Sequence, residues 1–232
     1  MNNSDHYLHK EHPKTKKETD FWGQVSRSVN GVAVSDEQIK LIHDAIGNGL
    51  QLNGTDHLLD LGCGNAALSS YFFNNIKEYT GVDFSEYLIE IAKKYFYQKD
   101  KTNYLVNDLV SFVTSEIQPL KYNKALCYGV FSYLSYESAE QLLTLLSREY
   151  KELEILYIGN LPNKKEAHKF YHDDIDYEPL LTDNLSAIGI WRTPEELKLL
   201  AERCGWSTEI RTMDDAFYAA HYRYDAILTR KK

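Results

Sequence analysis

The chain has 232 residues and a formal net charge of −8. Its length suits one large α/β domain with a substantial core. The acidic balance argues against a protein that holds DNA or RNA mainly through phosphate contacts, so a nucleic-acid partner is not expected.

Three cysteines, Cys63, Cys127 and Cys204, lie far apart in apolar runs. We interpret them as reduced, buried side chains of a cytoplasmic protein. The chain lacks an apolar run of about 18 residues, and its N-terminus lacks an apolar signal core, so neither membrane spanning nor export is expected.

Residues 1–18 are polar and are predicted to form a flexible tail, followed by a single domain over residues 19–232. The aromatic side chains Phe21 and Trp22 and the cation Arg27 precede the first predicted helix, Asp36–Gly47. Ser35 and Asp36 are suitable residues for the start of that helix.

A buried strand is predicted over His57–Leu61, followed by Gly62, Cys63 and Gly64 and by a helix over residues 66–74. Glycines at such a turn take backbone angles closed to other residues and leave room for a ligand beside the main chain. This arrangement predicts a nucleotide-type pocket. The carboxylate of Asp60 would repel a pyrophosphate there, and it would attract a ligand with an ammonium or sulfonium group.

The next predicted strand, residues 78–82, ends at Asp83 and Phe84, about 20 residues beyond the glycine turn. This is the spacing expected of a carboxylate that accepts hydrogen bonds from the ribose hydroxyls. The ring of Phe84 can lie flat against an adenine. The alternative is that such acids are surface residues that only cap helices.

The run Leu59-Asp60-Leu61-Gly62-Cys63-Gly64 resembles motif I of the class I S-adenosylmethionine-dependent methyltransferases, although Ala66 stands at the usual third glycine. The resemblance covers roughly residues 20–230 and implies S-adenosylmethionine as the cofactor. It also implies that Asp108, after a strand at 103–106, meets the adenine amino group while Leu109 packs on the ring.

In this family an N-terminal segment, here residues 19–50, commonly covers the cofactor as a lid. The resemblance then implies that Trp22 packs on the methionine moiety and that Arg27 pairs with its carboxylate. The alternative is a helix that merely covers the edge of the sheet.

Strands alternate with helical patterns of about ten residues, which indicates βαβ crossovers and a parallel sheet. Thr193, Pro194 and Glu196 predict a further helix start, and two closing strands follow at 207–213 and 222–229. The fold expected from the pattern and the resemblance is a three-layer αβα sandwich with a mostly parallel seven-stranded sheet and an antiparallel last strand. The remaining predicted elements are helices at 85–97, 109–115 and 138–150 and strands at 122–128 and 153–158.

The tip of the fourth strand matches motif IV in position and carries Tyr128, which we expect to reach the cofactor. Phe131 and Tyr133 are candidates for the substrate pocket. An Asn-Pro-Pro-Tyr-like stretch, typical of family members that methylate nucleobases or protein glutamine, is missing here. Hydroxyls, carboxylates and aliphatic amines remain as acceptors.

Regular patterning stops over residues 160–190, which predicts a substrate-side insertion that contributes Tyr171 to the substrate pocket. His168 and His172 are four residues apart and would share one helical face beside two aspartates. They are interpreted as candidate catalytic bases, with a metal site and a solvated face as alternatives. His221, at the start of the last strand, is the third candidate base. The fourth and fifth strand ends lack the acids of metal-dependent relatives, so no metal is expected.

These features predict transfer of a methyl group from S-adenosylmethionine to a hydroxyl, amine or carboxylate of a small molecule or sugar. Parts of the second half loosely resemble stand-alone bacterial methyltransferases of carbohydrate and natural-product pathways. A homodimer is left open. The alternatives are an inactive methyltransferase-like scaffold and an NAD-dependent oxidoreductase, which Asp60 disfavours.

Overall fold

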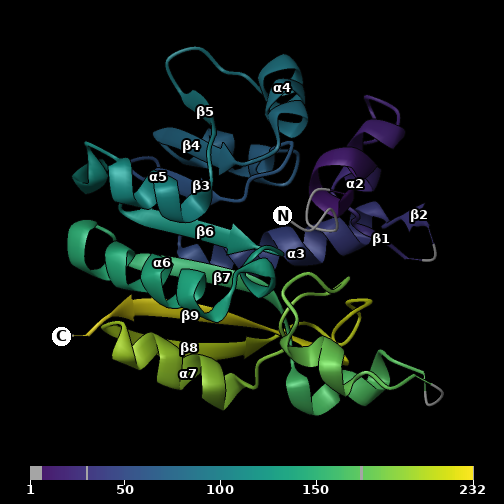
Figure 1. Ribbon diagram of the computed structural model, residues 1–232. Coiled ribbons are helices and arrows are strands. Elements are labelled where there is room, and N and C mark those ends of the chain that lie inside the picture. Colours follow the sequence, from purple (N-terminus) through teal and green to yellow (C-terminus); the bar gives the residue numbers. More distant parts are fainter. Residues whose placement is uncertain (1–6, 30, 173–174, 232) are drawn as a thin grey trace.

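The computed structural model describes residues 7–29, 31–172 and 175–231. Its main feature is a seven-stranded sheet in the order β5-β4-β3-β6-β7-β9-β8 (Figure 1). All strands run parallel except β9, which pairs antiparallel with both β7 and β8. This confirms the predicted sheet. The strands are β3 (His57–Leu61), β4 (Glu78–Asp83), β5 (Thr102–Val106), β6 (Lys124–Tyr128), β7 (Ile155–Pro162), β8 (Trp206–Thr212) and β9 (Arg223–Arg230).

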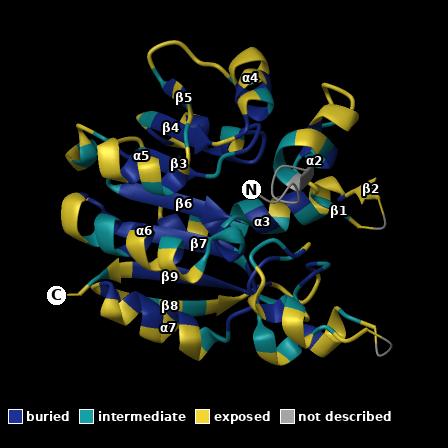
Figure 2. Cartoon of the chain, in the orientation of Figure 1, coloured by how far each residue is buried: buried dark blue, intermediate teal, exposed yellow. Residues whose placement is uncertain are grey.

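Helices cover both faces of the sheet and bury one apolar core on each. The side chain of Leu58 lies in the core that includes residues of α3 and α4, and the side chain of Leu59 lies in the core shared with α5, α6 and α7. Successive strand residues point to opposite faces, so the inner strands are buried on both sides, as Figure 2 shows for β3, β4, β6 and β7, whereas the edge strands β5 and β8 are partly exposed. The helices are α3 (Asp36–Leu50), α4 (Glu86–Tyr95), α5 (Leu109–Ser115), α6 (Tyr136–Glu149) and α7 (Pro194–Arg203).

The N-terminal part differs from the predicted loose tail. A π-helical turn, η1 (Tyr7–Glu11), and a 3-10 turn, η2 (His12–Thr15), contact α4, and η2 also contacts the short helix α2 (Phe21–Gln24). A two-stranded ribbon, β1 (Ser28–Val29) with β2 (Val32–Ala33), follows. Residues 1–6 of the predicted tail lie outside the described residues.

The segment after the glycine turn also differs from the prediction. Instead of a helix that begins at Ala66, a turn leads into a 3-10 helix, η3 (Ser69–Asn75). Ala66 takes a left-handed backbone with φ of 60°. A glycine would adopt this conformation without steric cost, which explains why the position usually carries one.

The predicted insertion, residues 160–190, overlaps the end of β7, which runs on to Pro162. It contains two 3-10 helices, η6 (Lys164–Lys169) and η7 (Glu178–Thr182). In Figure 1 this segment, α2 and the β1–β2 ribbon gather at the end of the sheet at which β6 and β7 terminate. Two further 3-10 helices are η4 (Pro119–Lys121) and η5 (Phe131–Tyr133). Within the described residues, none of the helices has the length and apolar character needed to cross a membrane.

Candidate active site

The glycine turn after β3 requires glycine for two separate reasons. Gly62 and Gly64 have positive φ angles of 84° and 55°, a region that disfavours side chains. A Cβ on Gly62 would also lie 2.5 Å from Cγ2 of Val130, and one on Gly64 would lie 3.0 Å from Cγ1 of Val25. The side chains of Val130 and Val25 therefore border the turn at these two glycines.

Asp60 lies at the base of this turn, with 3% of its surface exposed. Its Oδ2 accepts hydrogen bonds from the hydroxyls of Ser69 and Tyr79, the latter at 2.8 Å. Its Oδ1 has no hydrogen-bond partner among the described residues. Burial raises the pKa of this carboxyl to about 6, although both hydroxyl donors act in the opposite direction. Asp60 is thus an oriented acid that is ionised at neutral pH.

Asp83 joins the tip of β4 to the glycine turn. Its Oδ2 accepts from the backbone N–H of Gly64 and its Oδ1 from that of Ser85, both at 2.9 Å. Burial raises the pKa of Asp83, and these backbone donors oppose the rise. A carboxylate has about four lone-pair sites, so it keeps acceptor capacity for two ribose hydroxyls.

Phe84 and Asp108 occupy the neighbouring strand ends. The Phe84 ring lies 5.0 Å from Lys10 Nζ and 6.1 Å from the His9 ring, so the N-terminal segment reaches over the predicted adenine position. Asp108 is exposed and caps α5, where its Oδ1 accepts from Ser111 N at 2.9 Å. Leu109 is buried in the core. Adenine contacts by Asp108 and Leu109 stay predictions.

Arg27 lies between two aromatic rings. Its guanidinium carbon is 5.5 Å from the centre of the Trp22 ring and 5.3 Å from that of Tyr128. Burial lowers the pKa of Arg27, while Asp60 is among the groups that oppose this effect. Because none of the described carboxylates lies within 4.0 Å of it, this cation is available for a ligand carboxylate.

The side-chain amides of Asn65 and Gln24 hold the N-terminal segment against the glycine turn. Neither residue was predicted from the sequence to have this role. Asn65 Nδ2 donates to the carbonyl of Phe21 and to Oε1 of Gln24, both at 2.8 Å. Gln24 Nε2 in turn donates to the carbonyls of Lys17 and Glu18. The only sequence clue was that Asn65 directly follows Gly64, and nothing in the sequence indicates its distant partner Gln24.

The tips of β6 and β7 carry buried polar atoms without partners. The Tyr128 hydroxyl and Asn160 Oδ1 have no hydrogen bond within the described part of the chain. Asn160 takes a left-handed φ of 63°, and its N–H donates to Oδ1 of Asp225 at 2.7 Å. Oδ2 of the same aspartate accepts from the Tyr157 hydroxyl at 2.5 Å. A buried network therefore holds Asn160 in a strained conformation, a feature that often marks functional sites.

The three predicted substrate-pocket residues have different surroundings. Phe131 is buried, and its ring centre lies 5.4 Å from the guanidinium of Arg192. The Tyr133 hydroxyl donates to the carbonyl of Ala187 at 2.9 Å, and its ring lies 4.5 Å from that of His9. Tyr133 therefore contacts both the insertion and the N-terminal segment.

Tyr171 belongs to an aromatic cluster in which its ring stacks on Tyr177 at 4.9 Å and lies 5.7 Å from Trp191. Phe170 and Tyr222 complete this cluster. The contacts of Tyr171 within the chain are packing contacts, and its role toward a substrate stays a prediction.

All three candidate histidines are exposed. Because η6 ends at Lys169, His168 and His172 do not share a helical face. The adjacent residues 173 and 174 lie outside the described residues. The ring of His221 lies 4.9 Å from that of Tyr222. In the described ranges, no group of three or more His, Cys, Asp or Glu side chains could hold a metal ion.

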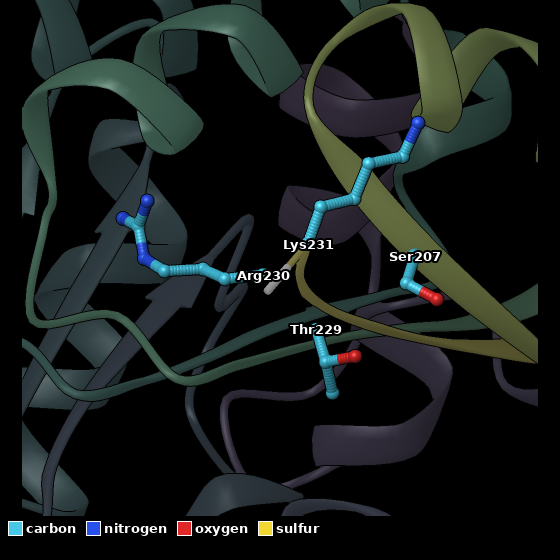
Figure 3. A pocket seen from close by; sticks show the side chains of 4 residues that line it. All are labelled: Ser207, Thr229, Arg230 and Lys231. Carbon is cyan, nitrogen blue, oxygen red and sulfur yellow. The ribbon is translucent and has the colours of Figure 1, made fainter.

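A separate hollow lies far from these residues. Ser207, Thr229, Arg230 and Lys231 line it at the start of β8 and the end of β9 (Figure 3). β8 runs parallel to β7, so this is the end of the sheet opposite the glycine turn. The Arg230 guanidinium already donates to the carbonyls of Leu146, Ser147, Tyr150 and Leu153, so this hollow presents no free cation from that residue.

Residues 59–151 match the model of a methyltransferase domain family. Magnesium protoporphyrin IX methyltransferase from Synechocystis PCC 6803, solved with bound SAM, is 13% identical with a TM-score of 0.60 over 100% of this chain and 98% of that one. A SAM-dependent methyltransferase from Archaeoglobus fulgidus is 18% identical, with a TM-score of 0.58 over 83% and 94% of the two chains. One from Clostridium acetobutylicum ATCC 824 is 13% identical, with a TM-score of 0.60 over 86% and 93%. The search of curated proteins gave no match.

The matched segment contains the glycine turn, Asp60 and Asp83, and the similarity to the solved methyltransferase from Synechocystis extends over the whole chain. Residues 59–151 therefore resemble a methyltransferase domain, and the fold is that of the class I S-adenosylmethionine-dependent methyltransferases.

Proposed function

We propose that this protein binds S-adenosylmethionine at the glycine turn and transfers its methyl group to a small-molecule acceptor. The observation that carries the proposal is the pair of oriented carboxylates, Asp60 and Asp83, beside that turn. Asp60 would attract the ammonium and the sulfonium of the cofactor, and Asp83 would accept from the ribose hydroxyls. A pyrophosphate would meet two negative charges at the same place.

Arg27 supplies the complementary charge. Its guanidinium is half-enclosed by Trp22 and Tyr128 and has no carboxylate partner in the described ranges. It is assigned to the carboxylate of the methionine moiety, which Trp22 would cover. Phe84 is assigned to the adenine, with Lys10 and the N-terminal segment over its ring.

The chemistry is an in-line displacement in which the acceptor atom attacks the methyl carbon and S-adenosylhomocysteine leaves. Because the sulfonium is already a good leaving group, alignment is the main contribution of the protein, and it is worth about 7–11 kcal/mol in well-oriented systems. Tyr128, which the sequence placed at the cofactor, and Asn160 lie at the tips of adjacent strands, and both are assigned here to the acceptor through their unpaired polar atoms.

A hydroxyl acceptor also needs a base, whereas a carboxylate acceptor does not. Of the three candidate histidines, His221 is favoured because its ring contacts Tyr222, directly before the first residue of β9. With a hydroxyl acceptor, His221→Ala is expected to lower turnover by about 10²-fold or more. His168→Ala and His172→Ala serve as comparisons, measured as labelled methyl transfer into a deproteinised cell extract. Full turnover in His221→Ala would remove that assignment.

Calorimetric titration with S-adenosylhomocysteine, and separately with NAD, tests the cofactor assignment. The expected result is saturable binding of S-adenosylhomocysteine and none of NAD. Binding of NAD alone would favour an oxidoreductase, and binding of neither would favour an inactive scaffold. A sugar or other small polar acceptor, a cytoplasmic location for this chain with its three free cysteines, and a homodimer stay predictions.

A further inference from the structure

The arginines of this chain divide into two groups. Arg148, Arg203 and Arg211 form ion pairs with nearby glutamates, and Arg230 donates to backbone carbonyls. In the described part of the chain, the remaining three lack a carboxylate within 4.0 Å. They are Arg27, Arg192 and Arg223, and all three lie near the tips of β6 and β7.

Arg27 is already assigned to the cofactor, and Arg192 is closed off from solvent by the side chains around it. Only 3% of the surface of Arg192 is exposed, and its two terminal nitrogens are buried without partners beneath the rings of Phe131 and Tyr136. Arg223 is half-buried and thus more accessible to a ligand.

Arg223 contacts Asn160, which is assigned to the acceptor together with Tyr128. We call this part of the site the acceptor side, and the part around Asp60, Asp83 and Arg27 the cofactor side. Arg223 is the first residue of β9 and pairs in register with Pro162, the last residue of β7. Its Nη1 donates to the carbonyl of Asn160, and its guanidinium carbon lies 4.9 Å from the centre of the Tyr222 ring. The other nitrogens of Arg223 have no hydrogen-bond acceptor among the described residues, so most N–H donors of its guanidinium are left for a ligand.

The groups that interact with Arg223 among the described residues are mostly tyrosines, together with the carboxylate of Asp225. Burial raises the pKa of Tyr128, Tyr133 and Tyr218, and the positive charge of Arg223 opposes that rise at all three. The carboxylate of Asp225 also feels this charge, but its two oxygens already accept from Tyr157 and from Asn160.

We propose that the methyl acceptor carries a carboxylate, and that Arg223 binds it while Tyr128 and Asn160 hydrogen-bond a polar group nearer the methyl. A guanidinium matches a carboxylate through two parallel hydrogen bonds, and the free donors of Arg223 supply such a fork. The unpaired Tyr128 hydroxyl and Asn160 Oδ1 then serve the uncharged part of the same molecule. This inference rests on the proposed function, since it concerns the acceptor of that reaction.

The test uses the full chain saturated with S-adenosylhomocysteine and a panel of aromatic and aliphatic hydroxy acids, each paired with its uncharged primary amide. The wild type is expected to bind at least one acid about tenfold or more tightly than its amide. Arg223→Gln should abolish this preference and Arg223→Lys should keep part of it. Arg203→Gln, at an exposed arginine of α7, should keep all of it.

The affinity for S-adenosylhomocysteine should be unchanged in Arg223→Gln, which separates a local effect from misfolding. If no pair favours the acid in the wild type, or if Arg223→Gln retains the preference, the inference is wrong. If S-adenosylhomocysteine itself fails to bind the wild type, the proposed function has failed instead. Titrating the same pairs into the free protein then tests Arg223 separately.

Discussion

The cofactor side and the acceptor side of the site differ in how their buried polar atoms are satisfied. At the cofactor side, protein donors orient Oδ2 of Asp60 and both oxygens of Asp83, while Oδ1 of Asp60 has no partner among the described residues. At the acceptor side, the Tyr128 hydroxyl and Asn160 Oδ1 are buried without partners in the described chain. Leaving such an atom unpaired costs about 1–3 kcal/mol. We infer that the cofactor side is organised before binding, whereas the acceptor side is completed by its ligand.

The largest loss of affinity for the cofactor product is expected when Asp83, on the cofactor side, is replaced. Asp83→Ala removes the proposed acceptor for two ribose hydroxyls and the link to Gly64, so the affinity for S-adenosylhomocysteine should fall by about 100-fold or more. Calorimetric titration measures this, with Asp44→Asn on the outer part of α3 as the control. An unchanged affinity would show that Asp83 has only a structural role.

A smaller, more selective loss is expected for Arg27. Arg27→Ala should weaken binding of S-adenosylhomocysteine by about 30-fold, because it removes one charge-assisted pair between a guanidinium and a carboxylate. It should leave the affinity for methylthioadenosine unchanged, because that compound lacks the amino-acid carboxylate. Equal losses for both ligands would mean that Arg27 does not contact the carboxylate.

Two tyrosine substitutions compare the two sides directly in the unliganded protein. Tyr79→Phe removes a donor to buried Asp60 and should lower the free energy of unfolding by about 1–3 kcal/mol. Tyr128→Phe removes a hydroxyl that has no partner and should not lower it. Chemical denaturation measures the free energy of unfolding of both variants. A similar loss in both would contradict the claim that only the tyrosine hydroxyl on the cofactor side is held by a protein hydrogen bond.

The sequence predicted the sheet and the strand-end acids well because these depend on local patterns. The bounds of β3 and α5 agree with the prediction, and the capping box at Thr193 and Glu196 begins α7 as expected. Asp60 and Asp83 follow from their positions relative to the glycine turn. Parallel strands end at one edge, so the spacing along the chain was sufficient to bring these two acids together.

The acceptor side was less predictable because its contacts join distant segments. Asn160 depends on Asp225, and its carbonyl accepts from Arg223 on another strand. Tyr171 was expected in the substrate pocket, yet its ring packs in a cluster with Tyr177 and Trp191 that no periodicity indicates. The same holds for η3, where the left-handed Ala66 delays the start of the helix.

The most direct test is the affinity for S-adenosylhomocysteine at pH 7 and pH 5 in the wild type and in Asp60→Asn. Burial raises the pKa of Asp60 to about 6 in the free protein, and the ligand ammonium favours its ionised form. Protonation at low pH must therefore weaken binding, by about tenfold between pH 7 and pH 5. Asp60→Asn should bind more weakly at pH 7 and show less than about a twofold change. A wild-type affinity that is equal at both pH values, or the same tenfold fall in Asp60→Asn, would contradict the assignment of Asp60 to the cofactor.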